Sequence, residues 1–209
     1  MKGLRLSVHV LKSGIFVIIF LFLFITLWSM SGVQLRLNFP FILILAVPLW
    51  VYFRLQRKNE RNSVIFSKEI LPNLFFFYLL TVAYVTLAPF HFTPPTITEG
   101  KMNITPYVQI LYQYKYKPPF FWMLYTLGNI VLFIPFGFIL PMLYKKHFQA
   151  LITIGLAILC SLSIELIQFF FTTDRAADID DFILNVFGAI IGYLLYLLMR
   201  LFLRKIDRK

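Results

Sequence analysis

The feature that most constrains this chain is a succession of six apolar runs, separated by short charged or proline-containing segments. The runs are Gly14–Met30, Phe39–Phe53, Ile70–Phe90, Phe120–Leu143, Ala150–Phe171 and Phe182–Leu203. A helix needs about 20 mostly apolar residues to cross the hydrocarbon core of a bilayer. The last four runs meet this length, the first is marginal, and the second is short and contains Pro48. We therefore predict an all-α integral membrane protein, a bundle of about six transmembrane helices.

The composition agrees with a chain that is exposed to lipid. Hydrophobic residues make up 60% of the sequence and charged residues 14%, whereas soluble domains average roughly 45–50% apolar and about 25% charged residues. A single soluble core of 209 residues could not cover this much apolar surface. The single cysteine, Cys160, excludes a small scaffold held by disulfide bonds.

The twenty Lys and Arg residues predict how the chain crosses the membrane. If the amino terminus is cytoplasmic, fifteen of them fall on the cytoplasmic side and five on the outer side. Because cytoplasmic loops of membrane proteins carry an excess of Lys and Arg, we predict that both termini are cytoplasmic. The basic segments Arg54–Lys68 and Arg200–Lys209 are expected to contact anionic lipid, and nucleic acid is not an expected partner.

This topology divides the chain into three parts. Residues 1–69 form a predicted N-terminal helical extension, with two hydrophobic segments and a basic cytoplasmic loop. Residues 70–203 form a predicted four-helix membrane domain with an external loop at 91–119, and residues 204–209 form a basic cytoplasmic tail. The external loop contains five prolines and four tyrosines. We expect it to lie at the level of the lipid headgroups, which tyrosine favours.

Polar residues inside the predicted spans are candidate functional residues, because each is costly in hydrocarbon and normally faces the interior of the bundle. Glu165 is the only carboxylate that we place within the bilayer. At about 100° per residue, one face of its helix carries four polar residues, Ser161, Glu165, Gln168 and Thr172. This face predicts a polar stripe that runs toward the outer surface.

A second polar face is predicted on the last span. Its members are Asp178, Asp181, Asn185, Gly188 and Gly192. The two glycines form a small-xxx-small pair, which we interpret as a surface for close helix packing. The rise per residue places Asn129, Glu165 and Asn185 in the outer half of the membrane. We therefore predict a polar notch that opens outward, with Asp174, Arg175, Asp178, Asp180 and Asp181 at its mouth.

The notch residues have more than one possible role. Glu165, Asp178 and Asp181 are candidate catalytic groups, since carboxylates can act as general acid and base. The candidate ligand-binding residues are Asn129, Gln168, Arg175, Asp180 and Asn185. Asp178, Asp180 and Asp181 could hold a divalent cation through oxygen ligands, and no other cofactor is expected. Structural roles stay open: Asp180 and Asp181 could cap a helix, and Glu165 could bond to a neighbouring helix.

Several motifs follow one another along the second half of the chain. They are Gly128–Pro141, Ser163–Gln168, Arg175 with Asp178–Asp181, and Asn185 with Gly188 and Gly192. Weaker upstream motifs lie at Thr86–Phe90 and Asn103–Tyr107. Over roughly residues 74–198, the chain resembles the VanZ-like family of bacterial membrane proteins. The residues that carry this resemblance include those of the predicted notch.

The resemblance implies a multi-pass protein of the bacterial cytoplasmic membrane. VanZ-like proteins are linked to low-level resistance to teicoplanin and related lipoglycopeptides, so the resemblance implies a similar role at the outer face. Its candidate partners are membrane lipid, a lipoglycopeptide and a cell-wall lipid intermediate. Two alternatives stay open. One is an integral membrane enzyme acting on a lipid headgroup or a polyprenyl-linked envelope intermediate, and the other is an ion-coupled carrier.

Overall fold

The computed structural model describes most of the chain. The described residues are 19, 22–33, 35–36, 39–58, 66–88, 91–92, 102–143, 149–172 and 176–206. They are mostly helical, as the apolar runs predict. Within these residues, four helices are long and apolar enough to cross a membrane, namely Ile70–Leu87, Pro119–Leu143, Gln149–Phe171 and Ile179–Ile206.

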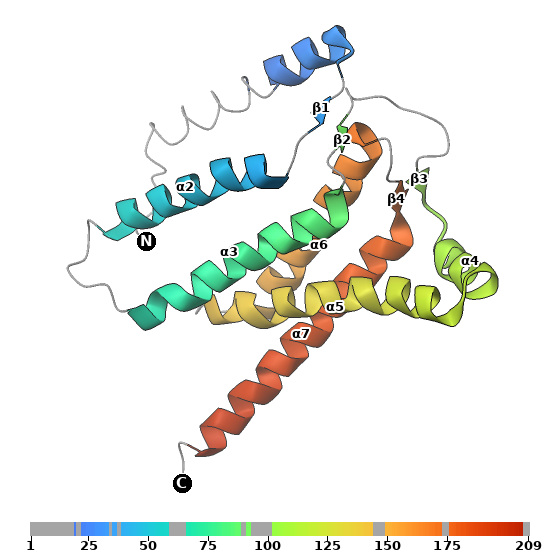
Figure 1. The fold of residues 1–209 in the computed structure, drawn as a ribbon. Coiled ribbons are helices and arrows are strands. Elements are labelled where there is room, and N and C mark those ends of the chain that lie inside the picture. Colours follow the sequence, from blue (N-terminus) through green and yellow to red (C-terminus); the bar gives the residue numbers. More distant parts are fainter. Residues whose placement is uncertain are drawn as a thin grey trace, which may run out of the picture.

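The elements follow the order labelled in Figure 1. They are β1 (Leu35–Arg36), α2 (Phe39–Lys58), α3 (Phe66–Leu87), β2 (His91–Phe92), β3 (Met102–Asn103), α4 (Val108–Tyr116), α5 (Pro119–Leu143), α6 (Gln149–Phe171), β4 (Ala177–Asp178) and α7 (Ile179–Ile206). The first two predicted spans correspond to shorter apolar helices in the described residues, Phe22–Ser31 and Ile42–Tyr52. The number of six spans therefore stays a prediction.

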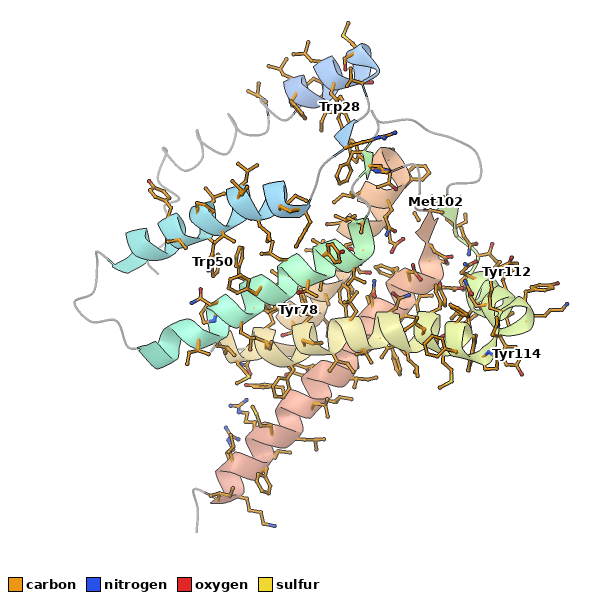
Figure 2. All side chains as sticks on the ribbon, viewed as in Figure 1. Trp28, Trp50, Tyr78, Met102, Tyr112 and Tyr114 are labelled. Carbon is orange, nitrogen blue, oxygen red and sulfur yellow. The ribbon has the colours of Figure 1, made fainter. Side chains whose placement is uncertain are left out.

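The core of the molecule lies where α3, α5, α6 and α7 meet. Its buried members are Val82, Phe133, Phe136, Leu140, Ala157, Ile164 and Ala189. Tyr78 of α3, labelled in Figure 2, joins this core and donates a hydrogen bond to the Leu132 carbonyl oxygen of α5 at 2.7 Å. The outer faces expose large apolar side chains, such as Leu159 and Leu194. Such exposure is expected where the surrounding solvent is lipid, because lipid tails are as apolar as leucine.

The closest helix contact in the described bundle is the crossing of α5 and α7, which Figure 1 shows. Glycines allow the two backbones to touch. A Cβ atom on Gly188 would collide with the Ile130 carbonyl oxygen, and one on Gly192 would collide with the Ile134 carbonyl oxygen. Gly137 of α5 lies in the same way against the backbone of α7. The crossing therefore fixes the position of α7, and with it the position of the acidic residues at the start of that helix.

Helix α2 lies along α3 (Figures 1 and 2). The Trp50 indole N–H donates a hydrogen bond to Asn73 Oδ1 at 2.8 Å, and the same ring stacks on Phe76 with centroids 4.6 Å apart. At the other end of α2, Phe39 contacts Tyr84 with ring centroids 4.8 Å apart. These aromatic contacts attach the predicted N-terminal extension to the four-helix domain.

The short strands gather at one end of the bundle (Figure 1). β1 pairs with β2 in antiparallel fashion, and β3 pairs with β4 in parallel fashion. Phe92 also bridges to Thr172, just after α6. The described parts of the two segments predicted to lie outside, 91–119 and 172–181, thus share one end of the molecule.

Residues 108–116 differ from the sequence-based expectation. The sequence places them in a predicted external loop at 91–119, yet in the structure they form helix α4. None of the residues of α4 is buried, so the packing of an apolar face into the core does not account for this helix. The physical reason for the helix is a contact with α7, which is part of the candidate site.

The α5–α7 crossing leads to a test of stability. Gly188→Ala and Gly192→Ala should each destabilise the protein by roughly 1–3 kcal/mol or more, because a methyl group must displace the backbone of α5. Thermal unfolding in detergent micelles measures the effect. Gly155→Ala on α6 is the matched control, since its Cβ meets nothing within 4 Å. Equal melting temperatures for all three variants would contradict this account of the crossing.

Candidate functional site

The first turn of α7 places a fully buried carboxylate against α4. Asp180 is 0% exposed. Its Oδ1 accepts a hydrogen bond from the Tyr107 N–H at 2.5 Å, and its Oδ2 accepts from the Gln109 and Ile110 N–H groups at 2.9 and 3.1 Å. Tyr107, the N-cap residue, has a left-handed φ of 67° and makes no side-chain cap of its own.

The carboxylate of Asp180 therefore caps α4 from another helix. The first N–H groups of a helix lack partners within that helix, and negative charge is favoured there by the helix dipole. This cap accounts for a nine-residue helix in a segment whose own sequence predicts a loop.

Asp178 holds the strand that precedes α4. Its Oδ1 accepts hydrogen bonds from the Asn103 side-chain amide at 3.1 Å and from the Asp180 N–H at 2.9 Å. The parallel pairing of β3 and β4 aligns Asn103 with Asp178. Burial raises the pKa of the Asp178 carboxyl above its usual range, and these two hydrogen bonds act in the opposite direction.

Asp181 faces a different helix. Its Oδ1 accepts a hydrogen bond from the Asn129 amide of α5 at 2.8 Å. The three neighbouring acids thus bind three separate segments: β3, the start of α4, and α5. In the part of the chain that the structure describes, no group of three or more His, Cys, Asp or Glu side chains could hold a metal ion.

Glu165 connects α6 to the same region. It is 8% exposed, and its Oε2 accepts a hydrogen bond from the Asp178 backbone N–H at 2.7 Å. Across the described ranges, its other oxygen, Oε1, has no hydrogen-bond partner. A buried carboxylate with one unused acceptor oxygen is a candidate for contact with a ligand.

Glu165 and Asp178 line a pocket of about 110 Å³. The pocket lies between α6, β3, β4 and the start of α7, and we call it the α6–α7 pocket. Its lining residues are Met102, Asn103, Ile104, Leu162, Glu165, Ala177, Asp178, Ile179 and Phe182. Most of the wall is apolar, and Met102, Ile104 and Leu162 also reach the surface. Figure 2 labels Met102 on β3, beside β4.

The other predicted notch residues that the structure describes lie outside the walls of this pocket. Gln168 is 5% exposed, and its amide donates a hydrogen bond to the Thr86 carbonyl oxygen of α3 at 2.9 Å. Asn185 is 2% exposed, and its amide donates to Ser161 Oγ at 3.0 Å. Both residues connect neighbouring helices inside the bundle. Arg175 and Asp174 fall outside the described residues.

Sequence reasoning missed the apolar part of the pocket and the role of β3. Leu162 and Phe182 lie beside Glu165 and Asp178, but one apolar residue among many in a span gives no signal of its own. Asn103 stands in one of the upstream motifs, and that motif was the available signal for its contact with Asp178.

The sequence also matches a known protein family over most of its length. A family model described as VanZ/LLP1 matches residues 75–200. The chain belongs to the VanZ-like family. The match includes every lining residue of the α6–α7 pocket. VanZ-like proteins are associated, as a family, with glycopeptide resistance. No curated protein and no solved structure gave a significant match to this chain.

The Asp180 cap leads to a second test. Asp180→Asn places N–H groups against the N–H groups of α4 and removes the charge, so amide exchange at residues 107–112 should become at least about tenfold faster. Hydrogen–deuterium exchange with mass spectrometry measures this rate.

Asp181→Asn is the matched control for that test. It alters a neighbouring acid that accepts a hydrogen bond from Asn129 of α5, so exchange at 107–112 should keep its original rate. Equal acceleration in both variants would contradict the specific cap.

Proposed function

We propose that this VanZ-like protein acts at the outer face of the bacterial cytoplasmic membrane. There it would lower the access of lipid-anchored glycopeptides, such as teicoplanin, to their cell-wall target. Family membership supports the link to glycopeptides. One observation supports the α6–α7 pocket as the binding site: the buried Glu165 carboxylate in a mostly apolar wall.

The pocket suits a molecule that has both a polar and an apolar part. Leu162 lines it and is also exposed on the outer face of α6, as is Leu159 one turn away. An acyl chain could therefore lie along this face of α6, while the polar end meets Glu165 and Asp178. Intramembrane carboxylates of this kind usually mark a functional site.

The distribution of charge supports a pocket that faces outward. The end of the bundle opposite the strands carries the basic end of α7, with Arg200, Arg204 and Lys205. Because positive residues concentrate on the cytoplasmic side, we place this end inside and the pocket end outside.

Cysteine labelling on intact cells tests this orientation. In a Cys160→Ser background, Thr105→Cys should react with a membrane-impermeant maleimide, because Thr105 is exposed beside the pocket. Lys205→Cys should react only after the cells are made permeable. Reaction of Lys205→Cys alone in intact cells would reverse the proposed topology.

Drug susceptibility tests the proposed role. Expression in a susceptible Gram-positive host should raise the teicoplanin concentration that inhibits growth several-fold, with a smaller change for vancomycin. Glu165→Gln should lose this protection because it replaces the one acidic group of α6 beside the pocket. Ser163→Ala, an exposed position two residues away, should keep it. Unchanged susceptibility to both drugs would refute the resistance role.

A second candidate function is an enzyme that acts on a lipid headgroup or a polyprenyl-linked intermediate. The observation that favours it is the presence of two carboxylates, Glu165 and Asp178, in one pocket, since such a pair can supply a general acid and a base. A membrane lipid profile that Glu165→Gln leaves unchanged would count against this candidate.

A further inference from the structure

A second hollow lies on the described surface where α4 meets the start of α5 (Figure 1), and we call it the α4–α5 groove. The two helices contact each other through Tyr114 and Trp122, whose ring centroids lie 5.5 Å apart. The groove shares no lining residue with the α6–α7 pocket. Its lining residues are Gln113, Lys117, Pro118, Phe121, Leu124 and Tyr125.

The α4 side of this groove supplies hydrogen-bond donors and a positive charge. Gln113 is half-buried and carries a side-chain amide, and Lys117 is exposed and carries an ammonium group. Lysine binds phosphate as a compact positive charge, and an amide N–H can donate to a phosphate oxygen. The groove volume of about 450 Å³ is many times the roughly 10–15 Å³ that one water molecule needs. A phosphate group with an attached glycerol therefore fits.

An apolar path leads from the groove along α5. At about 100° per residue, one face of this helix carries Phe121, Leu124, Gly128 and Val131. The three large side chains are 55, 58 and 60% exposed. Among the described residues, a Cβ atom on Gly128 would meet nothing within 4 Å, whereas one on Gly137 of the same helix would collide with α7. Gly128 therefore leaves open space on this face, along which an acyl chain can lie.

The length of α5 places the groove near the lipid headgroups. Pro119–Leu143 is a candidate span of 25 residues, roughly 37 Å long at 1.5 Å per residue, whereas the hydrocarbon core is about 30 Å thick. The first residues of α5 thus lie at the edge of the core, and Gln113 and Lys117 precede them. Tyr112 and Tyr114 of α4, labelled in Figure 2, are exposed, and tyrosine favours the headgroup level.

We infer that the α4–α5 groove binds an anionic phospholipid. The Lys117 ammonium and the Gln113 amide donate to the phosphate, and an acyl chain lies over Gly128 between Leu124 and Val131. The apolar path that continues from the polar wall favours a lipid over free phosphate. Net negative charge is favoured because Lys115 and Lys117, both exposed, place two positive charges within three residues. This site is separate from that of the proposed function and does not depend on it.

Native mass spectrometry of the purified full chain, titrated with lipids in neutral detergent, tests the inference. Phosphatidylglycerol should bind saturably and at least about tenfold more tightly than diacylglycerol, which lacks the phosphate. It should also bind more tightly than phosphatidylcholine, whose choline offsets the phosphate charge. Inorganic phosphate at the same concentration should not displace it, because free phosphate makes no use of the apolar path.

Two pairs of variants make the test specific to the groove. Lys117→Gln should weaken phosphatidylglycerol binding at least about fivefold, whereas Lys115→Gln removes the same charge from a residue outside the lining and should bind as the original chain does. Gly128→Leu fills the apolar path and should also weaken binding. Its matched control is Gly155→Leu on α6, where a Cβ likewise meets nothing within 4 Å. Thermal unfolding checks that each variant is folded.

Three results would overturn the inference. Equal binding of phosphatidylglycerol and diacylglycerol would exclude recognition of the phosphate. Equal weakening by Lys115→Gln and Lys117→Gln would show that surface charge attracts the lipid without the groove, and this pair decides the outcome even if Gly128→Leu does not fold. A dimer that Gly128→Leu dissociates, with no preference for phosphatidylglycerol, would assign the groove to a second copy of the chain.

Discussion

The structure of the site depends on one buried carboxylate, that of Asp180. It accepts three backbone N–H bonds from the start of α4, a segment 70 to 73 residues away in the sequence. These bonds hold α4 and the preceding strand β3 against the first turn of α7. β3 then supplies Met102 and Asn103 to the wall of the α6–α7 pocket. The cap therefore acts together with the β3–β4 pairing to fix this side of the pocket.

The glycine contact between α5 and α7 sets the place of that carboxylate. Because Gly188 and Gly192 let the two backbones touch, the start of α7 has a defined position at the strand end of the bundle. The Asp178 N–H then reaches Glu165 of α6. Helix packing at the glycines thus positions the acids at the start of α7, and these acids position β3 and α4.

Sequence reasoning predicted the positions of the four long helices well, but not which polar side chains bond to one another. The last four apolar runs match α3, α5, α6 and α7 closely, because a helix in lipid must satisfy its backbone within the segment. A helical wheel also indicates which residues share a face. It does not indicate which helix that face meets: Asn129 bonds to Asp181 across α5 and α7, whereas Asn185 bonds to Ser161 across α7 and α6. The cap of α4 joins distant segments, and local sequence carries no signal for it.

The central claim of the proposed function is that an amphiphile binds in the α6–α7 pocket, beside Glu165 and Asp178. Photocrosslinking in native membranes tests it most directly. Benzoylphenylalanine would replace Phe182, which lines the pocket, or Phe187, which is exposed on the same helix. The account predicts that the Phe182 position captures one particular amphiphile, identified by mass spectrometry, and that Glu165→Gln abolishes this product. Capture of the same bulk lipids at both positions, with or without Glu165, would contradict it.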